Sequence, residues 1–231
     1  MYEAVYAHPD GESTASRVAL AAARYGYDGV VVRGIDANPD YDRLREELDV
    51  DLVEAVEIDA PGPEHASGAV GNYRPQCELV IIRGGTNALN RFAVEQDRVD
   101  VLARPMDGRG NFNHVLAKAA RDNGVRVEFD FGPVLRTDGG TRVQALSDLR
   151  KLRELVEYYD VPYVVSGGPH SHLELRAPRE LAGLGEVIGF DREQVLDGLR
   201  EWGRLAERNR ERMSESFIAP GVKRGRYEED D

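Results

Sequence analysis

Arginine stands at the end of three short apolar runs of this sequence, at the same place in each run. These runs read Val-Val-Arg33-Gly, Ile-Ile-Arg83-Gly and Leu-Ala-Arg104-Pro, and Arg136 and Arg176 follow two later runs. The planar guanidinium of arginine binds a phosphate through two parallel hydrogen bonds. The sequence therefore offers candidates for anion binding, although the chain also has 42 aspartate and glutamate residues with which each arginine could pair instead.

Histidines near the ends of apolar runs offer a second kind of chemistry. His170 and His172 are two positions apart, and on an extended segment both side chains would point the same way and could bind one metal ion. His8 and Asp130 end other runs and could complete the site. This set supports an alternative function, that of a metal-dependent phosphoesterase of the polymerase-and-histidinol-phosphatase type. The first strand of that family ends in His-x-His, whereas His8 stands alone here, so we expect no catalytic metal and assign no catalytic residue.

The elements that position these side chains are short apolar strands alternating with helices. Most of the runs are continuously apolar, which is typical of parallel strands buried on both faces. No Gly-rich fingerprint follows the first run, and no Walker A sequence occurs, which disfavours an open nucleotide-binding sheet. The pattern predicts an α/β fold, a TIM-barrel-like parallel (β/α) barrel of seven or eight strands with its functional sites at the C-terminal strand ends. The predicted strands are 2–6, 30–32, 52–58, 79–82, 99–103, 125–131 and 163–165, with 186–189 as an eighth strand or only a turn.

Capping residues predict where the helices begin and end. Asn113 can accept a hydrogen bond from a free helix N–H, and Asn123-Gly124 can close that helix in the left-handed conformation. The segment 61–75, rich in Gly and Pro, is interpreted as a loop with at most one helical piece. Other predicted helix starts are Ser13, Asn38-Pro39, the capping-box spacing from Thr141 to Gln144, and Asp191 for a last helix that runs to about Met213.

Composition and charge limit the setting in which the chain works. Its 231 residues fit one barrel domain, which we place at 1–213, followed by a polar, acidic tail at 214–231 that we expect to be mobile. No apolar run is long enough to span a bilayer, and the single cysteine, Cys77, suits a reducing cytoplasm. The net charge is −12, yet only three of the 30 basic residues are lysines. An acidic, lysine-poor surface is typical of a protein from a halophilic cell.

Several segments together carry a resemblance to a known family. They are 113–120, the strand that contains Glu128, the helix and strand from Leu149 to Val165, and the turn Leu175-Arg176-Ala177-Pro178 that leads to Leu181 and Gly185. Their order and spacing resemble the archaeal and eukaryotic ribonuclease P protein component 3 family, from Tyr2 to about Met213. The turn 167–172 contains more histidine than this resemblance implies.

The resemblance implies a protein subunit of ribonuclease P, the endonuclease that removes the 5′ leader of precursor tRNA. The family fold is a TIM-like barrel related to metal-dependent phosphoesterase barrels but lacking their metal ligands. The RNA subunit carries out catalysis with bound magnesium, so the isolated chain is expected to be non-catalytic and to bind no cofactor. Implied partners are ribonuclease P RNA, precursor tRNA and other protein subunits, including a small α/β subunit, with no membrane.

With RNA as the implied partner, the candidate RNA-binding residues are Arg33, Arg83, Arg104, Lys118, Arg136 and Arg176. A net charge of −12 does not exclude RNA, because roughly molar salt screens the long-range field within about 3 Å and leaves only local contacts. Phosphate contacts nevertheless weaken as the salt concentration rises.

Overall fold

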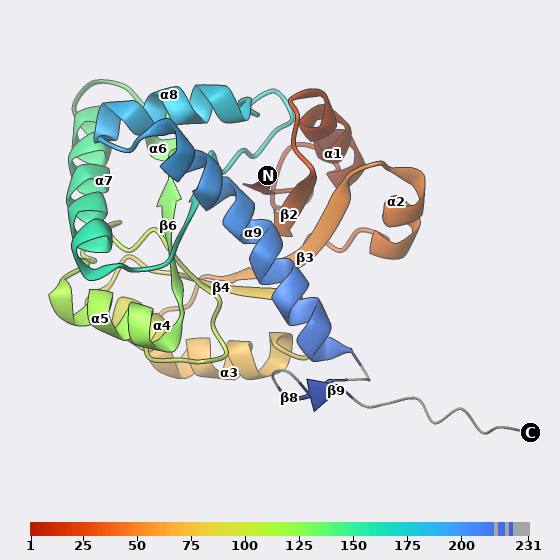
Figure 1. Ribbon diagram of the computed structural model, residues 1–231, viewed down its shortest axis with the longest axis horizontal. Helices are drawn as coiled ribbons and strands as arrows, with labels where there is room; N and C mark the ends of the chain where they lie inside the picture. The colour runs from red at the N-terminus through yellow and green to blue at the C-terminus, as the bar shows by residue number, and fades with distance from the viewer. Residues whose placement is uncertain (215–216, 220–221, 224–231) are drawn as a thin grey trace, which may run out of the picture.

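Seven strands form one parallel sheet in sequence order, and helices cover its outer side (Figure 1). The computed structural model describes residues 1–214, 217–219 and 222–223. The sheet curls into a nearly closed barrel, which confirms the predicted TIM-like fold with seven strands. Its strands are β1 (Tyr2–Val5), β2 (Gly29–Arg33), β3 (Asp51–Ile58), β4 (Leu79–Arg83), β5 (Val101–Ala103), β6 (Arg126–Asp130) and β7 (Tyr163–Ser166).

The two ends of the sheet, β1 and β7, meet through contacts at their C-terminal ends. The Tyr6 N–H donates to the Pro169 carbonyl at 3.0 Å. The Gly167 N–H donates to Oε1 of the buried Glu3 at 2.8 Å, and Tyr27 donates its hydroxyl proton to the other oxygen of that carboxyl group at 3.1 Å. The buried side chain of Glu3 therefore joins the barrel where strand pairing ends.

The outer helices follow the strands in turn. They are α1 (Ala15–Arg24), α2 (Tyr41–Glu47), α3 (Pro63–Tyr73), α4 (Asn87–Val94), α5 (His114–Asn123), α6 (Gly132–Arg136), α7 (Gly139–Tyr159), α8 (Pro178–Ile188) and α9 (Arg192–Met213). The segment 61–75 is mostly the helix α3 rather than a loop. The prediction of a strand or turn at 186–189 is wrong, because residues 186–188 form the last turn of α8 and Gly189 caps it in the left-handed conformation with φ 101°.

Some helices begin and end at the predicted caps, and others begin at a neighbouring residue. Asn113 accepts from the Val115 and Leu116 N–H groups, and Gly124 ends α5 with φ 66°, as predicted. Asp191 and Gln194 form a capping box at the start of α9, and α9 ends at Met213. The other predicted starts were shifted: the N-caps are Thr14 instead of Ser13, Asp40 instead of Asn38, and Asp138 instead of Thr141.

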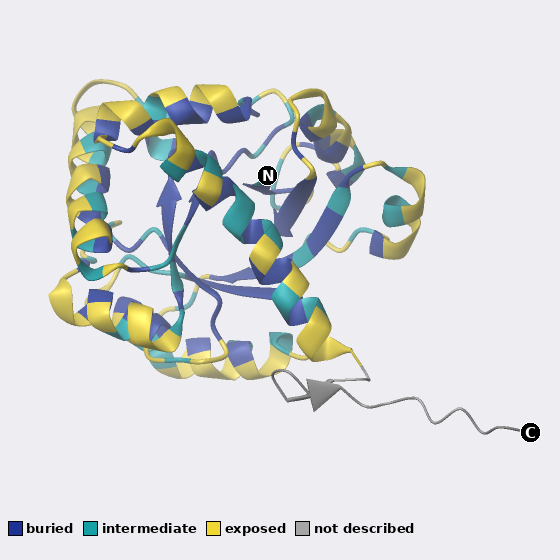
Figure 2. Cartoon of the chain, viewed as in Figure 1, coloured by how far each residue is buried: buried dark blue, intermediate teal, exposed yellow. Residues whose placement is uncertain are grey.

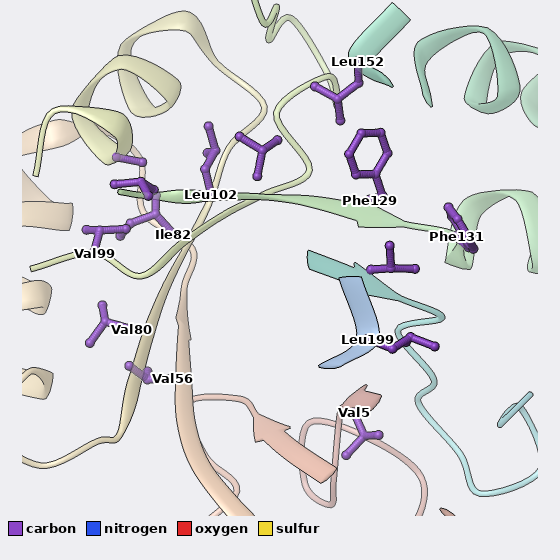
Figure 3. Close-up of a cluster of buried hydrophobic side chains, with 14 of the residues drawn as sticks. Val5, Val56, Val80, Ile82, Val99, Leu102, Phe129, Phe131, Leu152 and Leu199 are labelled. Atoms are coloured by element: carbon purple, nitrogen blue, oxygen red, sulfur yellow. The ribbon is translucent and has the colours of Figure 1, made fainter. Parts of the chain in front are cut away.

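One hydrophobic core lies between the sheet and the outer helices. Figure 2 shows the pattern, with buried inner faces and exposed outer faces on these helices. The buried side chains run from Val5 on β1 through Ile82 on β4 and Phe129 on β6 to Leu199 on α9, as Figure 3 shows. Outward-facing strand residues therefore hold the helices, while the alternate residues face the barrel interior.

A second core fills the barrel interior and includes the last helix. Trp202, Leu205 and Ala206 of α9 pack against inward-facing strand residues such as Ala4 and Val164. The indole N–H of the fully buried Trp202 donates to the Val165 carbonyl at 2.9 Å. Figure 1 shows α9 crossing the barrel diagonally. Its partners Asp51, Glu78 and Asp100 stand at or just before the starts of strands, so α9 covers the N-terminal end of the barrel.

The chain after α9 is described only in part. The strands β8 (Phe217–Ala219) and β9 (Val222–Lys223) pair antiparallel. Apart from Ser214 and these five residues, the predicted mobile tail at 214–231 lies outside the described residues. Across the described part of the chain, none of the helices is long and apolar enough to cross a membrane.

Candidate nucleic-acid interface at the barrel mouth

The C-terminal end of the barrel, here called the mouth, has a polar floor above the apolar interior. Ala4, Val31 and Val164 face the interior deeper in the barrel. Two residues further along the chain, and therefore on the same face, come Tyr6, Arg33 and Ser166, nearer the mouth. Two carboxylates, Glu57 on β3 and Glu128 on β6, complete the floor. Strand alternation thus brings polar groups from four strands and the residue after β1 to one place.

Arg33 is the centre of this floor and is fully buried. Its Nε donates to Glu57 Oε2 at 2.6 Å, while Nη1 and Nη2 donate to the two oxygens of Glu128, the second at 3.1 Å. The Tyr6 hydroxyl also donates to Glu57 Oε2, at 2.7 Å, and Ser166 donates to Glu128 Oε1 at 2.5 Å. Since no surface of Arg33 is exposed, its prediction as a direct RNA contact is wrong, and carboxylate pairing accounts for it instead.

The ion pairs decide the charge state of the floor. Burial disfavours the ionised form of Glu57, but the Arg33 guanidinium and the Tyr6 hydroxyl outweigh this and lower the pKa of Glu57. The two carboxylates raise the pKa of Arg33 well above its ordinary value, although burial opposes them. Burial raises the pKa of Glu128, although Arg33 opposes this. Arg33 and Glu57 are therefore the charged pair of the floor, and breaking that pair from one side would leave a buried charge without a partner.

Arg104 and Asp130 form the next layer toward solvent. Arg104 Nε donates to Asp130 Oδ2 at 2.7 Å, and both side chains are largely buried, at 15% and 4% exposure. Arg104 also has φ 48°, a left-handed conformation that is unfavourable for a residue with a side chain. A cavity of about 630 Å³ opens beside this pair, between the segment 104–111 and α7, with Gln144 and Lys151 on its wall.

Arg83 is the most exposed of the three strand-end arginines, at 36%. Its nearest carboxylate oxygens are Glu57 Oε1 at 3.9 Å and Asp59 Oδ2 at 4.0 Å. In the described part of the chain Glu57 Oε1 has no hydrogen-bond partner. Arg83 is thus the strand-end arginine with donors available for an external anion.

The other three candidate RNA-binding residues, Arg136, Arg176 and Lys118, each contact a different part of the chain. Arg136 donates to the carbonyls of Gly167 and Gly168, at 2.9 and 2.7 Å, and so holds the loop after β7. Arg176 donates to the carbonyls of Leu175 and Glu174 in its own turn, at 3.0 and 3.2 Å. Lys118 lies on the outer helix α5 with its Nζ 5.7 Å from the centre of the Tyr159 ring. The structure gathers Arg33, Arg83, Arg104 and Arg136 around the mouth and leaves Lys118 apart.

Three residues of the alternative metal site have other partners, and the fourth, His8, is exposed. His170 stacks on Tyr6, with 4.1 Å between ring centres, and the Arg33 guanidinium lies over the same ring at 5.2 Å. His172 Nδ1 lies 2.9 Å from the Ser13 hydroxyl, and Asp130 is paired with Arg104. His170 and His172 lie in a bend and a turn instead of an extended segment, and their rings have different partners, Tyr6 and Ser13. Among the described residues no group of three histidine, cysteine, aspartate or glutamate side chains could hold a metal ion.

Comparison with known proteins identifies the family. The family described as RNase P subunit p30 matches residues 1–214. The chain belongs to the RNase P subunit p30 family. Its relatives named ribonuclease P protein component 3 include those of Halorubrum lacusprofundi, 61% identical over 100% of both chains, and Halobacterium salinarum, 56% identical over 100% of both. Both come from halophilic archaea, in agreement with the acidic, lysine-poor composition.

Solved structures support the p30-family fold. The chain matches one chain of a cryo-EM structure of archaeal ribonuclease P with mature tRNA at a TM-score of 0.84, with 22% identity over 100% of both chains. It also matches histidinol phosphate phosphatase of Lactococcus lactis, complexed with zinc, L-histidinol and phosphate, at a TM-score of 0.52 and 12% identity, covering 82% of this chain and 94% of that one. The predicted kinship with the phosphoesterase barrels is therefore confirmed for the fold.

Sequence reasoning missed the carboxylates that organise the mouth. Glu57 and Glu128 alternate along β3 and β6 with apolar residues that pack under the helices, and a charged residue at an inward-facing strand position is the available signal. It would have indicated a buried partner for Arg33.

Proposed function

We propose that this p30-family chain works as a non-catalytic protein subunit of a ribonuclease P holoenzyme that removes the 5′ leader from precursor tRNA. The observation that carries this proposal is the match over the full length of both chains, at 61% identity, to a ribonuclease P protein component 3. The partners we infer are ribonuclease P RNA, precursor tRNA and further protein subunits, including a small α/β subunit, and the cytoplasm is the inferred site of action.

The chemistry of the mouth is consistent with a supporting role. A catalytic barrel of the phosphoesterase type needs metal ligands with free lone pairs at its mouth. Here the carboxylates of Glu57 and Glu128 are engaged by the guanidinium of Arg33, and Asp130 is engaged by Arg104. We infer that hydrolysis depends on magnesium held by the RNA subunit, with no cofactor bound by this chain.

An omission experiment tests the proposal. The holoenzyme is reconstituted in concentrated potassium chloride from its RNA and all protein subunits, with and without this chain, and the release of the 5′ leader from precursor tRNA is followed. We expect kcat/KM to fall markedly when the chain is omitted and to recover when it is added back. An unchanged kcat/KM would contradict the proposal.

A second measurement addresses the phosphoesterase alternative. The isolated chain is assayed for phosphate release from phosphomonoesters with manganese, zinc or iron added, and its metal content is determined. We expect neither turnover nor tightly held metal in stoichiometric amount. Turnover together with bound metal would replace the subunit assignment with the alternative.

A further inference from the structure

The cavity of about 630 Å³ beside the mouth is large enough for a ligand. It lies between the segment 104–111, which follows β5, and the N-terminal half of α7. Ligand sites in proteins commonly enclose about 300–1,000 Å³. The cavity can therefore take a group of the size of a nucleoside.

Hydrogen bonds fix the walls of the cavity before any ligand arrives. The fully buried Asn90 of α4 donates to the Pro105 carbonyl at 2.7 Å and to the Asn111 carbonyl at 3.3 Å. Lys151 of α7 donates to Asn111 Oδ1 at 2.8 Å and so ties one wall to the other. Arg104, where the segment starts, has the left-handed φ of 48°, and strain of this kind is concentrated at ligand sites. The site is thus preformed.

Apolar side chains line the cavity from both walls. Pro105 and Met106 line it on one side, and Leu149 and Leu152 of α7 line it on the other. The Phe112 N–H donates to Met106 Sδ at 3.3 Å and holds the thioether in place. A space between two apolar walls suits the flat faces of a heterocyclic base.

The charged groups that line the cavity are of both signs. The carboxylates are Asp107, Glu128, Asp130 and Asp148, and the cations are Arg104 and Lys151. Asp130 pairs with Arg104, whereas Asp107 forms no ion pair in the described part of the chain. A phosphate inside the cavity would be repelled by the carboxylates, and an ammonium group by the cations. An uncharged ring that carries both hydrogen-bond donors and acceptors fits this lining best.

Asp107 is the acceptor that gains most from a donor on the ligand. Partial burial raises the pKa of Asp107, and Arg104 opposes this. A hydrogen bond from a ligand would stabilise the charged form of the carboxylate. Arg83 also lowers that pKa, so its positive charge reaches Asp107. Since Arg83 has donors available for an anion, a nucleotide with its base in the cavity would have its phosphate toward Arg83.

We propose that the cavity between the segment 104–111 and α7 binds one unpaired, amino-bearing nucleobase of RNA, with Asp107 accepting from the base and Arg83 facing the adjoining phosphate. This inference rests on the proposed function, and the base belongs to ribonuclease P RNA or to precursor tRNA. Unpaired bases are the parts of RNA whose edges and faces a protein can enclose. Contacts with an uncharged base also keep their strength in concentrated salt, where phosphate contacts weaken.

The test compares two variants that remove the same charge from the mouth. Asp107→Ala removes a carboxylate that lines the cavity. Asp59→Ala removes a carboxylate that is 70% exposed, lies 4.0 Å from Arg83 and is not part of the cavity. Losing a negative charge should by itself strengthen the attraction of RNA phosphates, so only a contact with the base makes Asp107→Ala bind more weakly. Circular dichroism at high salt verifies that both variants are folded.

Two quantities are measured over a series of potassium chloride concentrations. They are the binding of transcribed ribonuclease P RNA to the assembled protein subunits and the KM of the holoenzyme for precursor tRNA. We expect Asp107→Ala to weaken one of them at least about fivefold, the lower end of what a specific base contact contributes. The salt dependence should keep its slope, since no phosphate contact is lost. Asp59→Ala should bind at least as tightly as the wild type. Weaker binding of ribonuclease P RNA assigns the base to that RNA, and a raised KM alone assigns it to precursor tRNA.

Chemical probing identifies the base. Kethoxal modifies unpaired guanine, and dimethyl sulfate modifies unpaired adenine and cytosine, each at the edge that carries or adjoins the amino group. We expect one base to be protected in the wild-type and Asp59→Ala assemblies and to become reactive in the Asp107→Ala assembly.

Three outcomes would overturn the inference. If Asp107→Ala matches Asp59→Ala in RNA binding, KM and base protection, the cavity inference fails while the proposed function stands on the leader-removal data. If Asp107→Ala fails to join the other protein subunits in the absence of RNA, the cavity takes a protein side chain instead. If the wild-type assembly neither binds the RNA nor needs this chain for leader removal, the proposed function and the inference fail together.

Discussion

Arg33 of β2 and Glu128 of β6 are joined across the barrel by an ion pair with two hydrogen bonds, and both side chains are at most 1% exposed. The guanidinium also bonds to Glu57, so one cation satisfies carboxylates from two strands. A buried network of ion pairs thus crosses the barrel beneath its mouth.

Replacing Arg33 with Met should destabilise the fold strongly. The change leaves Glu57 and Glu128 buried without a cation, and breaking a buried pair from one side costs about 3–5 kcal/mol. Denaturant unfolding followed by circular dichroism at high salt measures the loss. The triple variant Arg33→Met/Glu57→Gln/Glu128→Gln removes the orphaned charges and should recover part of the stability. A single variant as stable as the wild type would contradict this account of the mouth.

Glu3 should give stability a defined dependence on pH. Burial raises the pKa of Glu3 from 4.5 to about 8, despite hydrogen bonds from Gly167 and Tyr27. Between these values the folded chain holds a proton that the unfolded chain releases, so the free energy of unfolding should fall as the pH rises from about 4.5 to about 8. The stabilising contribution of protonated Glu3 is complete below about pH 4.5 and is lost above about pH 8. The slope from one such group is at most about 1.4 kcal/mol per pH unit.

The variant Glu3→Gln isolates this contribution. It cannot ionise, so its unfolding free energy should depend less on pH over the same window than that of the wild type. Denaturant unfolding of both proteins is measured at several pH values and fixed salt. Parallel curves for the two proteins would show that Glu3 is already charged in the folded state.

Salt should be required for folding. The chain has 42 acidic and 30 basic residues, and the repulsion among its charges must be screened. Circular dichroism should show loss of structure in dilute buffer and its return at roughly molar potassium chloride, where the screening length is about 3 Å. Full stability without salt would contradict the halophilic interpretation.

Gly198 of α9 should not tolerate a methyl group. An added Cβ would stand 2.5 Å from Val165 Cγ2 on β7, so overpacking should cost about 1–3 kcal/mol and outweigh the roughly 1 kcal/mol that alanine gains in a helix. Gly183 of α8 is the matched control, since nothing lies within 4 Å of an added Cβ there. Thermal melting should show Gly198→Ala lowered and Gly183→Ala unchanged or raised. Equal behaviour of the two variants would contradict the close packing of α9 on β7.

Variants of Arg83 and Arg104 should distinguish a loss of RNA binding at the mouth from a loss of protein stability. Arg104→Ala leaves Asp130 largely buried and unpaired, so its melting temperature should fall. Arg83→Ala removes a side chain with only long contacts to carboxylates, so its melting temperature should change little. If RNA phosphates reach the mouth, Arg83→Ala alone should weaken RNA binding without loss of stability. Thermal melting and RNA binding are measured for both variants. If Arg83→Ala binds RNA as tightly as the wild type, Arg83 is no longer a candidate RNA-binding residue.

The sequence predicted the features of the fold that depend on neighbouring residues. Asn113 and Gly124 cap α5 because their own backbone and side-chain preferences favour those positions. Helix α1 begins one residue later than predicted, since Ser13 and Thr14 can both cap a helix and tertiary contacts decide between them. Ser13 is buried and within hydrogen-bond distance of Ser171 and His172 instead. The prediction of a strand or turn at the end of α8 is wrong because a short apolar run fits either a strand or a helix.

The site depended on residues far apart in the chain. Arg33 meets carboxylates 24 and 95 positions away, and Arg208 meets Asp100 across 108 positions. No local pattern distinguishes an arginine that will face solvent from one that will be enclosed by such partners. The register of the strands decides it, and that register is fixed only when the barrel forms.

The position of α9 also has a consequence for the order in which the chain is made on the ribosome. The interior of the barrel is completed by Trp202, Leu205 and Ala206, which are synthesised after all seven strands. Until those residues emerge, the apolar interior lacks its cover at the N-terminal end, and a chain cut short before them would expose that surface to aggregation. Closure of the barrel core therefore waits until α9 has been synthesised, after every strand of the seven-stranded sheet.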